Sequence, residues 1–131
     1  MHTITRCASL AGVAIFAVLA GCQSKPATPP ATNRAALPTM ERVALAANAC
    51  WFKSGDPAFS AYRLAPELNS FSGRPRILAV PKGSPESRPL LVVQAEGNPA
   101  RIDAFGPMMD GAAGNRIRQD VIRFANGDKR C

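Results

Sequence analysis

The sequence predicts one small two-layer α+β domain, in which the four strands of a mainly antiparallel sheet come between a first and a last helix along the chain. Three observations support this fold class. Residues 40–131 number 92, which is enough for one hydrophobic core but not for two. An apolar stripe at helical spacing begins this part of the chain and a second one ends it. Four short strand candidates lie between these two stripes, and the order α-β-β-β-β-α places one or both helices on one face of the sheet.

The first helix is predicted from Met40 to about Trp51, with Thr39 as its N-cap. Turn residues at 53–57 end it. We expect Trp51–Phe52 and Phe71 to pack in the core, although an aromatic contact patch for a glycan or a protein is the alternative. The apolar face is formed by residues at helical spacing, namely Met40, Val43, Ala44, Ala47, Cys50 and Trp51.

Four strand candidates follow the first helix. Residues 58–68 form the weakest, because Pro66 cannot donate to a ladder and restricts the strand to a sheet edge. Residues 76–82 and 89–96 are continuous apolar, β-branched runs, which predict a central antiparallel hairpin. Residues 100–105 alternate in polarity after a turn at Asn98–Pro99.

The last helix is predicted within residues 110–127. Asp110 or Asn115 is a candidate cap, and Asn126–Gly127 is a typical C-terminal stop. Its apolar stripe is expected to consist of Ile117, Val121, Ile122 and Ala125.

Residues 1–21 have the three parts of a secretory signal. A short start with Arg6 precedes an uncharged, mainly apolar run from Cys7 to Gly21, and small residues stand before Cys22. A membrane-spanning helix needs about 20 apolar residues, and this run is too short for one.

The residues Leu19-Ala20-Gly21-Cys22 resemble the lipobox of bacterial lipoproteins. The resemblance implies that the Cys22 thiol receives a diacylglycerol, that residues 1–21 are removed, and that the new amino group is acylated. Two or more acyl chains hold a protein stably on a bilayer. Gln23 is not the aspartate that resembles an inner-membrane retention signal, so the periplasmic face of the outer membrane is expected and the inner membrane is the alternative.

Residues 22–39 contain the lipidated cysteine and a tether rich in proline, alanine and threonine. This stretch has no apolar periodicity and cannot bury a core. A proline-rich chain extends by about 3.1 Å per residue, which separates residues 40–131 from the bilayer by up to roughly 50 Å.

Once Cys7 is removed and Cys22 is lipidated, two of the four cysteines remain. An exported chain meets an oxidising compartment, so the simplest expectation is a disulfide between Cys50 and Cys131. Two buried free thiols are the alternative.

No catalytic motif is evident. The chain after Cys22 has no histidine to serve as a base, no cluster of metal-ligating residues and no glycine-rich phosphate loop. We therefore expect neither an enzyme nor a bound cofactor or metal, and an enzyme remains a minor alternative.

Arginine is prominent, and it favours bidentate contacts with phosphate and carboxylate. Residues 40–131 hold 13 basic and nine acidic residues, a modest excess. We expect docking on a protein partner of the cell envelope. Binding of an anionic envelope polymer, peptidoglycan or lipopolysaccharide, through Arg116, Arg118 and Arg123 is the alternative, and nucleic acid lies in the wrong compartment.

Overall fold

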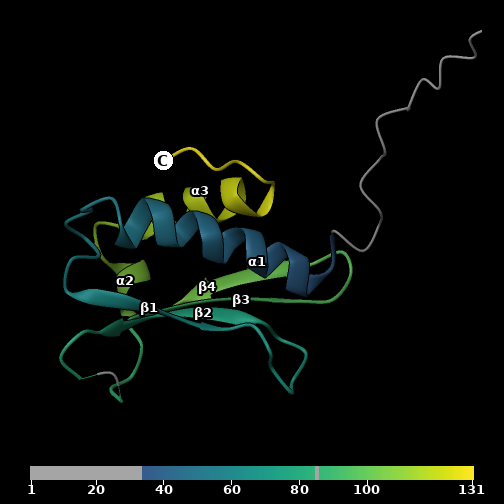
Figure 1. Ribbon diagram of the computed structural model, residues 1–131, viewed down its shortest axis with the longest axis horizontal. Helices are drawn as coiled ribbons and strands as arrows, with labels where there is room; N and C mark the ends of the chain where they lie inside the picture. The colour runs from purple at the N-terminus through teal and green to yellow at the C-terminus, as the bar shows by residue number, and fades with distance from the viewer. Residues whose placement is uncertain (1–33, 85) are drawn as a thin grey trace, which may run out of the picture.

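The computed structural model describes residues 34–84 and 86–131. The predicted signal peptide, Cys22 and the tether as far as residue 33 lie outside the described residues. Two layers make up the domain, with helices on one face of an antiparallel sheet (Figure 1). The predicted fold class is therefore confirmed. None of the helices in the described ranges is long and apolar enough to cross a membrane.

The sheet has the order β1-β2-β3-β4 and every neighbouring pair is antiparallel. The predicted hairpin occupies its centre and the strand that contains Pro66 lies at an edge, as expected. The strands are β1 (Tyr62–Glu67), β2 (Arg76–Pro81), β3 (Leu91–Glu96) and β4 (Arg101–Phe105).

Helix α1 spans Ala36–Ala47 and continues as the π-helical turn η2, Asn48–Phe52. It begins four residues before the predicted start, so Thr39 is not its N-cap. Pro38 fits in the first turn because the N–H groups there have no partner within the helix. The start is instead fixed by the β3–β4 turn, where Gly97 accepts a hydrogen bond from the Ala36 N–H at 3.0 Å.

The end of the chain forms a short helix α2 (Pro107–Asp110) and then α3 (Gly114–Ala125), which packs against α1. Neither predicted cap is correct, because Asp110 ends α2 and Asn115 already lies inside α3. Ile117 and Val121 are buried as predicted, whereas Ile122 is 57% exposed and Phe124 is buried in its place. The helix stops at Asn126 and the left-handed Gly127, as expected.

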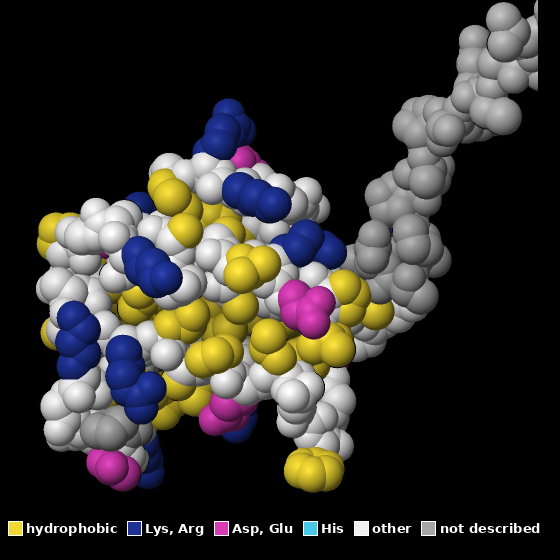
Figure 2. All heavy atoms as spheres, in the orientation of Figure 1, with side chains coloured by type: hydrophobic (Ala, Val, Ile, Leu, Met, Phe, Trp, Pro, Cys, Tyr) yellow, Lys and Arg dark blue, Asp and Glu magenta, His cyan; other side chains and the backbone are white. Residues whose placement is uncertain are grey.

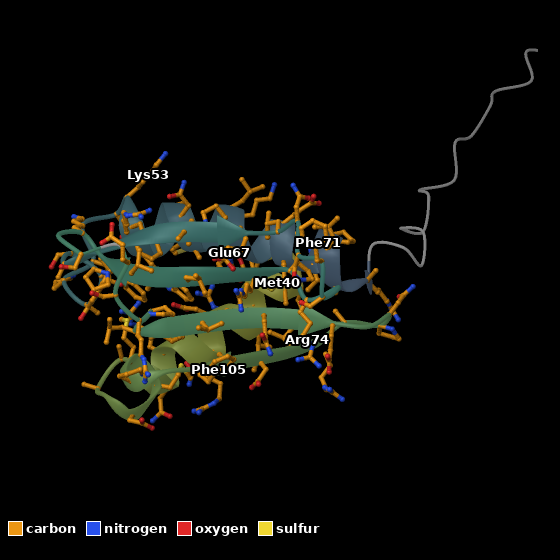
Figure 3. The ribbon with its side chains drawn as sticks, turned by 90° about the horizontal axis from the view of Figure 1, so that it is seen from below. Met40, Lys53, Glu67, Phe71, Arg74 and Phe105 are labelled. Carbon is orange, nitrogen blue, oxygen red and sulfur yellow. A yellow bond between two sulfur atoms is a disulfide. The ribbon has the colours of Figure 1, made fainter. Side chains whose placement is uncertain are left out.

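The core lies between the helices and the inner face of the sheet. Trp51 is buried at its centre, stacked on Phe59 at 4.9 Å between ring centroids and tilted against Phe124. The prediction that Trp51 packs in the core is confirmed. For Phe71 the same prediction is wrong: this side chain is fully exposed in the loop between β1 and β2 (Figure 3).

Candidate functional site

Two of the three arginines predicted to bind an anion or a partner are held by carboxylates. Arg116 lies 2.8 Å from the Asp56 carboxylate and 3.6 Å from that of Asp120. Arg123 lies 2.6 Å from Asp120 and 3.3 Å from Asp128. Their charges therefore serve the contact between α3 and the rest of the domain.

Arg118 is exposed and its guanidinium contacts the side-chain oxygen of Asn115 at 3.2 Å. It forms no ion pair with any residue that the structure describes. Since a helix turns by 100° per residue, position 118 does not share the face of positions 116, 120 and 123. The structure does not bring the three arginines together into one site.

The disulfide between Cys50 and Cys131 is present, with the two Cα atoms 5.1 Å apart. It joins the C-terminal tail (residues 126–131) to the turn that follows α1. The tail is also held at Asp128, which accepts hydrogen bonds from the side chain and the backbone N–H of Arg130 and from Arg123. The side-chain hydrogen bond from Arg130, followed by the backbone one, holds the pKa of Asp128 well below its usual range.

The outward side of α1 carries an apolar surface centred on Leu45, whose side chain is 72% exposed. Figure 2 shows hydrophobic side chains gathered across the middle of this view, over α1 and the strand beneath it. Leu45 does not belong to the predicted apolar stripe of the first helix. This mismatch is the sequence signal that indicates a large apolar residue on the solvent side.

Leu45 stands between two hollows, and we call the whole surface the Leu45 face. The tail groove, of about 330 Å³, lies between α1 and the C-terminal tail and is lined by Arg42, Leu45, Ala46, Ala49, Phe124, Gly127, Asp128 and Lys129. The edge groove, of about 440 Å³, lies between α1 and β1 and is lined by Glu41, Ala44, Leu45, Asn48, Leu64, Pro66 and Leu68. A ridge between two mainly apolar grooves is a shape that accepts the side chains of another protein.

The free edge of β1 is poorly suited to adding another strand. The Lys82 N–H binds the Ala61 carbonyl, so in this register the residues at 62, 64 and 66 direct their backbone groups away from β2. The Tyr62 N–H is already bound to Phe59, and Pro66 has no N–H. Within β1 this leaves one outward donor, the N–H of Leu64, beside the outward carbonyls of residues 62, 64 and 66. A backbone ladder would be incomplete, so side chains must carry most of a contact here.

Four exposed cations lie at the end of the sheet where β1 begins, and we call this group the basic end. It consists of Lys53, Arg63, Lys82 and Arg88. Lys82 donates to the Ser60 carbonyl at 2.7 Å, and Arg63 pairs with Val80 at the end of β2. None of the four forms an ion pair with a carboxylate of residues 34–84 or 86–131. Figure 2 shows Lys and Arg side chains gathered beside the hydrophobic surface, on the side away from the grey N-terminal part.

A third hollow, of about 380 Å³, opens on the outer face of the sheet and is polar. Glu96 binds the guanidinium groups of both Arg74 and Arg101 there, and Gln94, Ile102 and Asp103 complete the lining. In the described part of the chain, no three histidine, cysteine, aspartate or glutamate residues lie close enough to hold a metal ion.

No family model, no curated protein and no solved structure matches the chain. Among the hollows of the described residues, the two grooves of the Leu45 face have mainly apolar linings, whereas the hollow around Glu96 is polar.

Proposed function

We propose that the chain is a membrane-anchored envelope lipoprotein whose small, non-catalytic domain docks on a protein partner through the Leu45 face. The observation that carries the proposal is the 72% exposure of Leu45 between two mainly apolar grooves. A single exposed leucine is common, but an exposed leucine that continues into two apolar grooves forms the kind of contiguous surface that marks an interaction site. The anchor is supported by the lipobox-like residues Leu19 to Cys22.

The pairing of charges favours a protein partner over an anionic polymer. Arg116 and Arg123 are neutralised by carboxylates of the same domain, which removes two of the three cations that would bind peptidoglycan or lipopolysaccharide on α3. The Leu45 face has an apolar centre and charged residues at its margin, the usual arrangement of a protein–protein interface. The basic end beside it favours a partner with carboxylates on that side.

The docking face is preorganised. The Arg42 side chain crosses from α1 to α3 and donates two hydrogen bonds to the Ala125 carbonyl, at 3.1 and 2.9 Å. The disulfide fixes the tail that walls one groove. A surface held in this way loses little conformational entropy when it binds.

The docking is tested by placing a photo-cross-linking amino acid at position 45 of the full-length protein in its own cells. We expect a discrete cross-link to one protein, because Leu45 lies at the centre of the contact. The matched control is position 122, since Ile122 is 57% exposed on α3 and lies outside both grooves. Equal cross-linking at 45 and 122, or none at 45, would contradict the docking surface.

The salt dependence of binding distinguishes a protein partner from an anionic polymer. Screening shortens the Debye length from about 10 Å at 0.1 M to about 3 Å at 1 M, so a mainly coulombic contact weakens over this range. Photo-cross-linking at position 45 carried out in envelope extract at 1 M salt should therefore still give the same product as at 0.1 M. Salt-sensitive capture on purified peptidoglycan or lipopolysaccharide, lost when Arg116, Arg118 and Arg123 are reversed in charge, would instead favour the polymer.

The anchor is tested separately with Cys22→Ala. We expect metabolic labelling by an alkyne fatty acid to be lost, because the thiol that receives the diacylglycerol is absent. Cys7 provides the control, since Cys7→Ala leaves the lipobox intact and should be labelled like the parent. Label that persists in Cys22→Ala would refute the lipoprotein assignment.

A further inference from the structure

Phe71 is a large apolar side chain with no neighbours to cover it. It is fully exposed at the tip of the β1–β2 loop, and Figure 3 places it at one end of the sheet. The hydroxyl groups of Ser70 and Ser72 on either side bind each other at 2.7 Å, and the Gly73 N–H closes the turn on the Ser70 carbonyl. Polar contacts therefore hold the turn, whose conformation does not depend on contacts of the aromatic ring.

The loop that carries Phe71 lies at the end of the domain where the chain enters. Glu67 of β1 pairs with Arg76 of β2 at the same end of the sheet as the β3–β4 turn. That turn holds the start of the domain, since the Arg34 carbonyl accepts the Ala100 N–H at 2.7 Å. Phe71 and the residue to which the predicted tether connects thus share one end, which we call the entry end.

Other exposed groups of the entry end are apolar or cationic. Leu37, in the first turn of α1, is 42% exposed. Arg34, Arg74 and Arg101 are exposed cations, and the last two share the single carboxylate of Glu96. An aromatic ring, an aliphatic side chain and surplus arginines are the combination that suits the headgroup layer of a bilayer. There Phe and Leu side chains bury at the boundary with the acyl chains, and guanidinium groups bind phosphate.

We infer that the entry end rests on the membrane surface, with Phe71 inserted at headgroup level and the arginines against lipid phosphates. The inference rests on the anchor in the proposed function. The eleven residues between Cys22 and Arg34 reach at most roughly 35 Å as an extended proline-rich chain, so the domain stays near the bilayer. A tether raises the effective concentration of the surface to the millimolar range, and a contact too weak to recruit a free protein is then occupied.

This orientation leaves the docking surface accessible. The Leu45 face runs along α1, which starts at the entry end, so it points sideways, along the membrane plane. The basic end lies at the opposite end of the sheet and points away from the lipid.

The test uses the chain that begins at Cys22, with Phe71→Trp, coupled through the Cys22 thiol to a maleimide lipid in vesicles of phosphatidylethanolamine and phosphatidylglycerol. Cys50 and Cys131 are paired, which leaves Cys22 as the free thiol of this chain. Chemical coupling keeps the experiment independent of whether cells lipidate Cys22, which the alkyne label decides. The native Trp51 is buried and gives a constant background. Phe105→Trp is the matched control, since Phe105 is 45% exposed at the far end of β4.

We expect tryptophan at 71 to emit at shorter wavelength on vesicles than in solution, to lose quenching by iodide and to be quenched by brominated lipid. Tryptophan at 105 should change in none of these respects. Emission at 71 that stays unshifted and open to iodide on the vesicles would overturn the inference. Equal shifts at 71 and 105 would also overturn it, because the outer face of the sheet and not the entry end would then lie on the lipid.

Discussion

The indole nitrogen of Trp51 donates a hydrogen bond of 2.9 Å to the Asp120 carboxylate within the core. Asp120 is 8% exposed and receives Arg123 and Arg116 on its other sides. A buried carboxylate is tolerated when it is paired and hydrogen-bonded, as this one is. One side chain therefore satisfies the largest aromatic residue of the core and fixes two arginines of α3, which explains why those arginines are not available to an anion.

Asp120→Ala should lower the free energy of unfolding by about 1–3 kcal/mol, because the buried indole N–H loses its acceptor. Denaturant unfolding followed by fluorescence measures this directly, since Trp51 is the single tryptophan. Asp120→Asn keeps an acceptor for the indole and should recover part of the loss. The control is Asp110→Ala at the exposed end of α2, and an equally large loss there would contradict the role of the buried hydrogen bond.

At the scale of the elements, the sequence pattern was sufficient for the four strands, for the central β2–β3 hairpin and for the edge position of β1. Alternation and β-branched runs depend on local burial, which the pattern records directly. The helix starts were missed because tertiary contacts set them. The β3–β4 turn begins α1 at Ala36, and the packing of Gly114 on Met109 begins α3 without a capping side chain.

Some features of the candidate site could likewise be predicted from the sequence, and others could not. The disulfide could be predicted by counting cysteines, and the helical period already left Leu45 outside the apolar stripe. The pairs of Arg116 and Arg123 with Asp120 follow from helical spacing. Their pairs with Asp56 and Asp128 could not be predicted, since these carboxylates come from other segments of the chain. Phe71 was misplaced because composition indicates that a phenylalanine prefers the core but does not indicate which one lies at a loop tip.

Gly114→Ala tests how α3 begins. In the interior of an isolated helix this change is favourable by about 1 kcal/mol, and Gly114 is the first residue of α3. Here the added methyl group would collide with the Met109 carbonyl oxygen, part of the backbone of α2. We therefore expect a net destabilisation of about 1–3 kcal/mol, as for other overpacked sites. Gly83→Ala is the control, since nothing lies within 4 Å of the added atom. Stabilisation by Gly114→Ala in urea unfolding would mean that propensity and not packing governs this helix start.

At the scale of the whole molecule, one covalent bond joins the turn after the first helix to the end of the chain. Cys50 follows α1 and Cys131 is the last residue of the chain, so the bond spans a separation of 81 residues. All four strands and both later helices lie between them. In the chain-entropy account, closing a loop of this length restricts the unfolded chain by about 4 kcal/mol. For a domain this small, that is a large share of the total stability.

Cys131→Ser should therefore lower the free energy of unfolding by about 2–5 kcal/mol, the usual cost of losing a disulfide from a small secreted domain. Cys131 is the better position to change, because it is exposed whereas Cys50 is buried and its replacement would also disturb the core. Each kcal/mol corresponds to about 4–8 °C in a domain of this size, so calorimetry resolves the effect. Reducing the parent protein supplies the control. Its unfolding temperature should fall to that of Cys131→Ser, while the unfolding temperature of the variant should not change with reductant. A variant that unfolds at the parent temperature would mean that α1, α3 and the Asp128 contacts hold the tail in place by themselves.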